Sequence, residues 1–128
     1  MASKQHKIDL INGLYQQLKP VFDSSGQSMY IYLDDAHKVC NKKFASLLKY
    51  SSPEEWAKAD ESFPTALVDT NSQNTLISAY QDAMEKMVGS TIKVTWKTKS
   101  GEKVNTSVIL VPITYQQHMF ALHFVSKL

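Results

Sequence analysis

The side chains that could do chemistry are few and widely spaced. The four histidines are His6, His37, His118 and His123, and their spacing matches no metal-ligand motif. The single cysteine, Cys40, lies in a predicted strand, where a short apolar residue is expected to be buried rather than reactive. The sequence contains neither a Gly-rich phosphate loop nor a Ser/His/Asp set at suggestive spacing. We therefore expect no metal site, no catalytic residues and no enzymatic activity.

His123 is the strongest candidate for a functional side chain. If its ring faces the interior, the neutral imidazole offers one hydrogen-bond donor and one acceptor to a ligand, and its pKa depends on burial. The alternative is a structural histidine whose ring is satisfied by Tyr80, by Thr106 or by a backbone carbonyl. The carboxylate pair Asp34 and Asp35 lies in a predicted turn, where both side chains are expected to stabilise the turn.

Composition narrows the class of protein. The 128 residues, 43% of them apolar and 20% charged, are typical of one globular domain with a real core. A net charge of +2 with scattered lysines gives no support for a nucleic-acid partner. No apolar stretch resembles a secretory leader or a membrane span, and one cysteine fits a reducing compartment. The sequence predicts a cytoplasmic protein with no membrane partner.

Three consecutive strands are predicted at 91–98, 103–113 and 117–125. Their connections are short, which implies antiparallel neighbours, and Gly101 supplies the flexible position of the first loop. Alternation sorts the side chains onto two faces. Lys93 and Lys97 cannot be buried, so the face with Val94 and Trp96 is the buried side of the first strand. The later strands are apolar on both faces, which requires a layer of structure on each side.

The rest of the chain is expected to supply these layers and two more strands. We predict an amphipathic helix at 3–18 ended by Pro20, a linker at 21–27, strands at 28–33 and 39–40, and a helix capped by Asn41. Ser52 starts a short helix with a capping box, anchored by Trp56 and Phe63. A loop around Pro64 leads to a long helix at 72–88, closed by Gly89.

Three segments together resemble a PAS domain, including its LOV branch. NKKFASLLKY, which opens with Asn41, is similar to the helix "N-x-x-F-x-x-L-x-x-Y" of that family. SPEEWA is similar to the next helix, and TKSGEKVNTSVILVPI followed by HMFALHFVSKL is similar to the last three strands. The turn at 34–38 departs from the family because it lacks the usual glycine. The resemblance implies an α+β fold with a five-stranded antiparallel sheet, helices on one face, an N-terminal helix at 1–20 and the PAS-like domain at 21–128.

The resemblance also implies a site between the sheet and the helices. In the LOV branch, the residues matching Trp96, Thr106 and His123 point at the flavin. The expected ligand-binding residues are therefore His123, Trp96, Thr106, Tyr80, Val108 and Leu110. Flavin is not expected, because 63–80 lacks the photoactive cysteine and the indole of Trp96 would occupy ring space. Haem is not expected either, because 63–89 contains no histidine. The ligand, if any, is left unknown.

The opposite face of the sheet carries a second apolar set that water should not cover in a stable monomer. We expect the N-terminal helix, a second copy of the chain, or both to cover it. The expected interface residues are Ile109, Val111, Phe120, Leu122, Phe124, Ile11 and Leu18. The function implied is a sensory or signalling module that binds a small organic ligand, forms a homodimer, or both, and that could contact a signalling protein. The alternative is a small α+β enzyme or carrier protein with His123 in its pocket.

Overall fold

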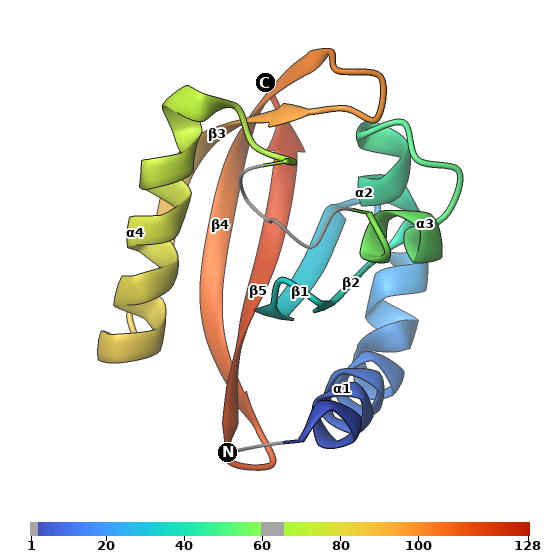
Figure 1. Cartoon of the computed structure of the whole chain (residues 1–128), viewed down its shortest axis with the longest axis vertical. Helices are drawn as coiled ribbons and strands as arrows, with labels where there is room; N and C mark the ends of the chain where they lie inside the picture. The colour runs from blue at the N-terminus through green and yellow to red at the C-terminus, as the bar shows by residue number, and fades with distance from the viewer. Residues whose placement is uncertain (1–2, 60–65) are drawn as a thin grey trace.

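The computed structural model describes residues 3–59 and 66–128, so Phe63 and Pro64 lie outside the described residues. The described part contains one sheet of five antiparallel strands in the order β2-β1-β5-β4-β3 (Figure 1). The strands are β1 (Ser28–Asp34), β2 (His37–Cys40), β3 (Ser90–Lys97), β4 (Lys103–Tyr115) and β5 (His118–Lys127). Strands β1 and β5 pair in the middle of the sheet, although they are far apart in the sequence.

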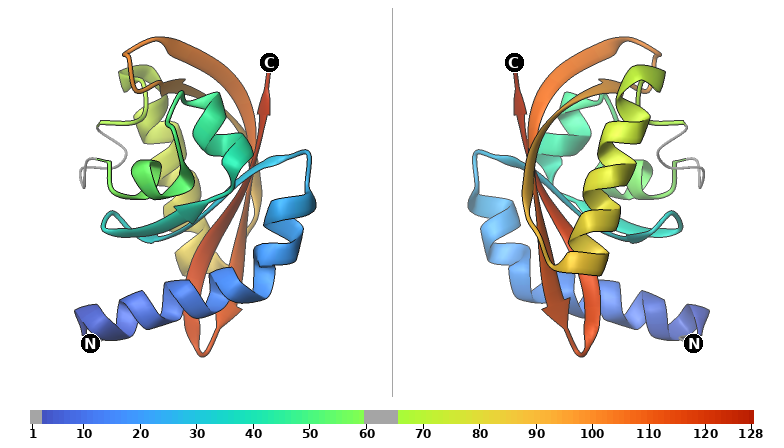
Figure 2. Two further views of the ribbon diagram at one scale, coloured as in Figure 1. Left: turned by 90° about the vertical axis from the view of Figure 1, so that its right-hand side faces the viewer. Right: turned by 90° about the vertical axis from the view of Figure 1, so that its left-hand side faces the viewer.

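Helices lie on both faces of this sheet. They are α1 (Lys4–Ser24), α2 (Lys42–Leu47), α3 (Pro53–Ala57) and α4 (Thr70–Lys86). Helices α2, α3 and α4 share a core with the inner face of the sheet, whereas α1 packs on the outer face with a core of its own (Figure 2). Both the α+β fold class and the predicted placement of α1 apart from the other helices are confirmed.

Helix α1 is longer than the sequence predicts. It runs through Pro20 to Ser24 instead of ending before the proline. The hydroxyl of Ser24 donates to the carbonyl of Pro20 at 2.6 Å, and Phe22 is buried against the sheet. A proline removes one backbone donor and disfavours the helix interior. Burial of an aromatic ring in the following turn offsets that cost, so the expected linker at 21–27 shortens to three residues, 25–27.

The ends of α4 also differ from the prediction. The helix begins at Thr70, with the side chain of Asp69 accepting from the backbone N–H of Asn71, and it ends at Lys86. Met87, not Gly89, adopts the left-handed conformation that closes the helix, with φ 56°. The left-handed conformation raises the free energy of a residue that has a Cβ atom, such as methionine. The side chain of Met87 is 57% exposed.

Two predicted helix caps are confirmed. The side chain of Asn41 accepts from the N–H of Phe44, and the hydroxyl of Ser52 accepts from the N–H of Glu55. The Glu55 carboxylate reaches back one residue further than expected, to the N–H of Ser51 at 2.7 Å. The glycine-free turn between β1 and β2 is closed by Asp34, whose carboxylate accepts from the N–H of Ala36 at 3.1 Å.

Candidate functional site

The inner face of the sheet carries a cluster of five rings beneath the helical layer. This aromatic cluster consists of Tyr30, Phe44, Trp56, Trp96 and His123, each no more than 2% exposed. Tyr30 and His123 lie opposite each other on β1 and β5, and their rings stack 3.8 Å apart at an angle of 7°. Phe44 stacks on Tyr30 at 4.8 Å, and both indoles meet Tyr30 edge-on. Aromatic pairs of this kind stabilise a core beyond their burial alone.

The imidazole of His123 is almost completely buried. Burial lowers the pKa of His123 to about 3, and the backbone hydrogen bonds of Ala121 and Tyr30 act in the opposite direction. The ring is therefore neutral near pH 7. Among the described residues its Nδ1 atom has no hydrogen-bond partner. A buried polar nitrogen without a partner is uncommon and costs stability, so it marks a place where a polar group could bind.

Four of the other expected ligand-binding residues lie on the inner face of the sheet. Trp96, Thr106, Val108 and Leu110 are all buried on the inner face. The indole Nε1 of Trp96 donates to the hydroxyl of Thr106 at 2.9 Å, and that hydroxyl donates to the carbonyl of Val94 at 2.8 Å. Thr106 is therefore engaged away from the His123 ring.

Tyr80 forms its hydrogen bond and its ring contact with residues other than His123. It is half-buried on α4, and its hydroxyl donates to the carbonyl of Leu33 at 3.4 Å, beside the ring of Tyr32. Of the three partners that the sequence analysis names for a structural His123, Tyr80 and Thr106 form hydrogen bonds elsewhere, whereas backbone groups of Ala121 and Tyr30 do act on the ring. The ring that stacks on His123 belongs to Tyr30, which the sequence analysis does not name. The sequence predicts that Tyr30 lies in a strand, but the position of Tyr30 opposite His123 depends on the register between β1 and β5, which the sequence does not reveal.

The expected interface residues are only partly brought together. Phe120 and Ile11 are buried where α1 crosses the sheet, and Leu18, Leu122 and Phe124 pack half-buried around them. Val111 is half-buried outside this core, and Ile109 is 47% exposed on β4. Helix α1 thus covers the part of the outer face formed by β1 and β5 and leaves Ile109 open.

Asn41 joins four segments at the end of α1. Its Oδ1 atom accepts from the N–H groups of Met29 in β1, at 3.1 Å, and Phe44 in α2, at 3.0 Å. Its Nδ2 atom donates to the carbonyls of Gln27, at 2.8 Å, and Phe22 in α1, at 3.4 Å. All four hydrogen-bonding positions of this buried amide, its two N–H donors and its two oxygen lone pairs, are thereby used. One side chain therefore couples the position of α1 to that of α2 on the other layer.

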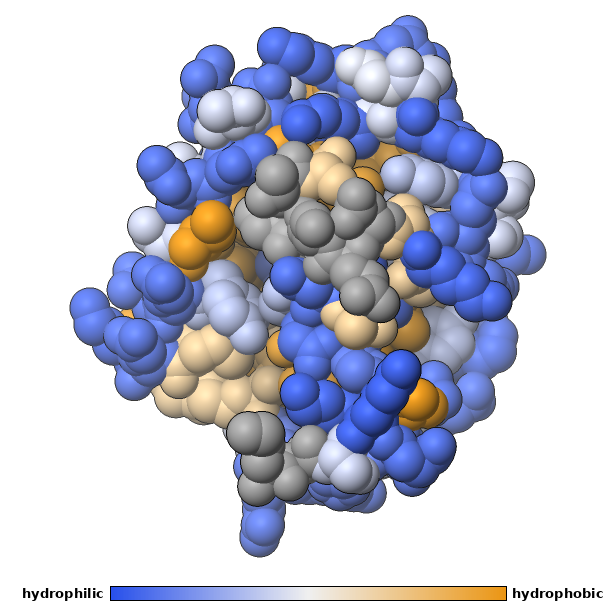
Figure 3. Space-filling model, in the orientation of Figure 1, coloured by the Kyte–Doolittle hydropathy of each residue, from blue (hydrophilic) through white to orange (hydrophobic). Residues whose placement is uncertain are grey.

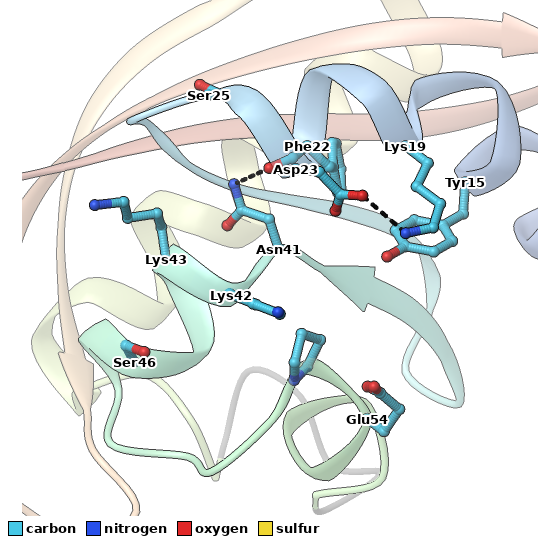
Figure 4. Close-up of a pocket in the computed structure, with 11 residues that line it drawn as sticks. Tyr15, Lys19, Phe22, Asp23, Ser25, Asn41, Lys42, Lys43, Ser46 and Glu54 are labelled. Carbon is cyan, nitrogen blue, oxygen red and sulfur yellow. Dashed lines mark hydrogen bonds and ion pairs between the residues drawn. The ribbon is translucent and has the colours of Figure 1, made fainter.

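A groove lies between α1 on one side and α2 and α3 on the other, and Asn41 forms part of its wall (Figure 4). Its volume is about 710 Å³, and it is lined by Tyr15, Lys19, Phe22, Asp23, Ser25, Asn41, Lys42, Lys43, Ser46, Pro53 and Glu54. Lys19 is paired with Asp23 at 2.8 Å, and the Lys42 side chain points toward the space between α1 and α3. The groove could not be found from the sequence, because it forms only where α1 meets the other layer.

An ion pair between Lys7 and Asp34 also connects the start of α1 to the turn between β1 and β2. The ammonium of Lys7 lies 3.1 Å from one carboxylate oxygen of Asp34, whose other oxygen lies 2.7 Å from Nδ1 of His37. Partial burial of Asp34 is the largest single influence on its pKa and raises it, but the hydrogen bonds and charges of His37 and Lys7 together outweigh burial, so the pKa of Asp34 is lowered. Asp34 therefore both closes the β1–β2 turn and anchors α1.

Comparison with solved structures places this fold among PAS domains. The chain superimposes on the PAS domain of a protein from Colwellia psychrerythraea with a TM-score of 0.69 and 19% identity, covering 90% of this chain and 97% of that one. A PAS domain of a two-component sensor histidine kinase gives 0.68 and 13%, covering 91% and 98%. The LOV protein of Rhodobacter sphaeroides gives 0.69 and 14%, covering 91% and 68%. The structure is a PAS fold, as the sequence segments predicted.

The other comparisons add nothing to this assignment. No family model matches the sequence, and no curated protein matches it. The helices in the described ranges are each too short or too polar to cross a membrane. On the face shown in Figure 3, hydrophilic residues dominate outside the grey atoms, and apolar residues lie in separate spots.

Proposed function

We propose that the chain is a sensory or interaction module that links events at the inner aromatic cluster to the position of α1. The observation that carries the proposal is the Asn41 junction, since its one amide holds α1, β1 and the start of α2 together. A change in the helical layer that moves α2 would change the hydrogen bonds that hold α1. The sensory role is supported by the PAS domain of the sensor histidine kinase, which has the same fold.

The inner cluster is the proposed ligand site. Its support is the unpartnered Nδ1 of His123, which would gain a hydrogen bond from a small organic ligand with a donor group. A flavin does not fit these side chains. The indole of Trp96 packs against Tyr30 and Phe44 and is held by Thr106, so a tricyclic ring at this position would have to displace it.

A native mass spectrum tests the ligand part of this proposal. We expect a fraction of the protein as purified to carry a small organic molecule, and the fraction to fall when His123 is replaced by phenylalanine, which cannot accept the hydrogen bond. The control is Tyr80→Phe, because the Tyr80 hydroxyl is engaged with Leu33. Ligand-free spectra under all conditions would contradict binding at this cluster and leave the interaction role alone.

Self-association through the outer face is the second part of the proposal. Ile109 is 47% exposed on β4, beside the half-buried Val111 and Phe124, and an apolar strand surface of this kind favours contact with a second copy. We expect Ile109→Glu to weaken dimerisation at least about tenfold, because it would bury an unpaired charge. Sedimentation equilibrium over a range of concentrations measures the effect.

Val88→Glu is the matched control for this experiment. Val88 is also aliphatic and is 46% exposed, but it follows α4 rather than lying on the outer face of the sheet. It should dimerise like the unmodified protein. A monomer mass at every concentration, or equal losses in the two variants, would contradict an interface at Ile109.

The enzyme or carrier alternative is less well supported. A general base is most effective with a pKa near the working pH, whereas burial lowers the pKa of His123 to about 3. Cys40 is buried, and burial raises the pKa of its thiol, which disfavours the reactive thiolate. We therefore propose binding and signalling rather than turnover.

A further inference from the structure

Two histidines far apart in the sequence meet where α1 passes the hairpin between β4 and β5. His6 lies in the first turn of α1, and His118 is the first residue of β5. Their Nε2 atoms are 3.4 Å apart, and their rings meet edge-on with centroids 5.2 Å apart. His6 is exposed and His118 is half-buried, so the pair is open to solvent on one side. The proposed signalling role uses neither ring.

The separation of the two nitrogens matches a shared metal ion. A tetrahedral ion binds imidazole nitrogen at about 2.0–2.1 Å, which places two such nitrogens about 3.3–3.4 Å apart. The hydrogen bond that now joins the rings requires one nitrogen to be protonated and the other to be free. A cation between two neutral imidazoles would replace this single hydrogen bond with two coordinate bonds.

We propose that His6 and His118 form a two-histidine site for a divalent ion that favours imidazole, such as Zn²⁺, Ni²⁺ or Cu²⁺. Within residues 3–59 and 66–128 no third His, Cys, Asp or Glu side chain completes a larger metal cluster. The remaining coordination positions are therefore taken by water, which is typical of an exchangeable ion and not of a closed structural site.

The charges around the pair permit this binding. Lys7, the neighbour of His6 in the sequence, has its ammonium engaged with Asp34 at 3.1 Å. Asp9, one turn further along α1, carries a carboxylate hydrogen-bonded to the side-chain amide of Gln5. The ion would join α1 to the β4–β5 hairpin and so fix the helix that the Asn41 junction holds at its other end. The proposal itself rests on the geometry of the pair and not on the sensory function.

Calorimetric titration of tag-free, chelator-treated protein with Zn²⁺ tests the site. We expect saturable binding of one ion per chain, and at saturating Zn²⁺ a rise in melting temperature of roughly 5 °C or more. His6→Ala and His118→Ala should each lose about tenfold or more in affinity, because each removes one of two protein ligands. Mg²⁺, which prefers oxygen ligands, should neither bind nor stabilise.

His37→Ala is the matched control, because it removes a histidine that contacts Asp34 and not this pair. Its binding of Zn²⁺ should equal that of the unmodified protein, with each melting temperature compared to that of the same variant without metal. Cu²⁺ should also broaden the NMR signals of His6 and His118 selectively. Absence of saturable binding, or affinity retained after loss of either His6 or His118, would overturn the proposal.

Discussion

Replacing Asn41 by alanine is expected to lower the free energy of unfolding by about 3 kcal/mol or more. The amide accepts from the N–H groups of Met29 and Phe44 and donates to the carbonyls of Phe22 and Gln27. The side chain is 3% exposed, so water cannot readily replace it. Alanine would remove the cap of α2, worth about 1 kcal/mol, and leave buried backbone groups unpaired, each costing about 1–3 kcal/mol. Urea unfolding measures the loss.

Ser52→Ala is the matched control for the Asn41 variant. The hydroxyl of Ser52 caps α3 by accepting one hydrogen bond from the N–H of Glu55, and within 3–59 and 66–128 it joins no other segment. It should cost only about 1 kcal/mol. Hydrogen exchange adds a local readout, because the amides of Met29 and Phe44 should lose protection only in the Asn41 variant. Equal losses of stability in the two variants would mean that Asn41 acts as an ordinary helix cap and does not couple the layers.

Acidification from pH 7 to pH 5 is expected to cost the folded protein about 2 kcal/mol through His123 alone. The unfolded histidine takes up a proton near pH 6.5, whereas burial lowers the folded-state pKa to about 3. The stabilising difference is thus fully present above pH 6.5 and is lost as the pH falls from 6.5 toward 3. The slope in that window is about 1.4 kcal/mol per pH unit. Urea unfolding at a series of pH values measures it.

The window above pH 5 separates His123 from the carboxylates. The pKa values of Asp34, Glu55, Asp69 and Glu102 are lowered in the folded protein, so their contributions are lost only as the pH falls below about 4.5. His123→Phe and His123→Gln, which do not titrate, should flatten the stability profile between pH 7 and pH 5. An unchanged slope in whichever of these variants folds would show that His123 is protonated in the folded state.

The orientation of the sheet was predictable from single residues. Lys93 and Lys97 alternate with Val94 and Trp96, and charged side chains cannot occupy a core without partners. That choice placed Trp96 and His123 on the inner face, where both are buried. The helix caps at Asn41 and Ser52 could also be predicted from the sequence, because the start of a helix depends on hydrogen bonds between neighbouring residues.

The parts of the structure that the sequence did not reveal depend on contacts between distant segments. Local rules end α1 at Pro20, whereas burial of Phe22 against the sheet extends it. The stacking of Tyr30 on His123 depends on the register between β1 and β5. The pairing of His6 with His118 joins two residues that are 112 positions apart in the sequence. None of these has a signature within one helix or strand.

The pairing of β1 with β5 has a consequence for biosynthesis. Met29 and Ile31 lie in β1, which is synthesised before the other four strands. Strand β5, which pairs with β1, leaves the ribosome last among the five. Until then the first hairpin has an open edge and an apolar surface in water, which is a state prone to aggregation. Closure of the central sheet must wait for nearly the whole domain to emerge, so folding is expected to be late and cooperative instead of proceeding piece by piece during translation.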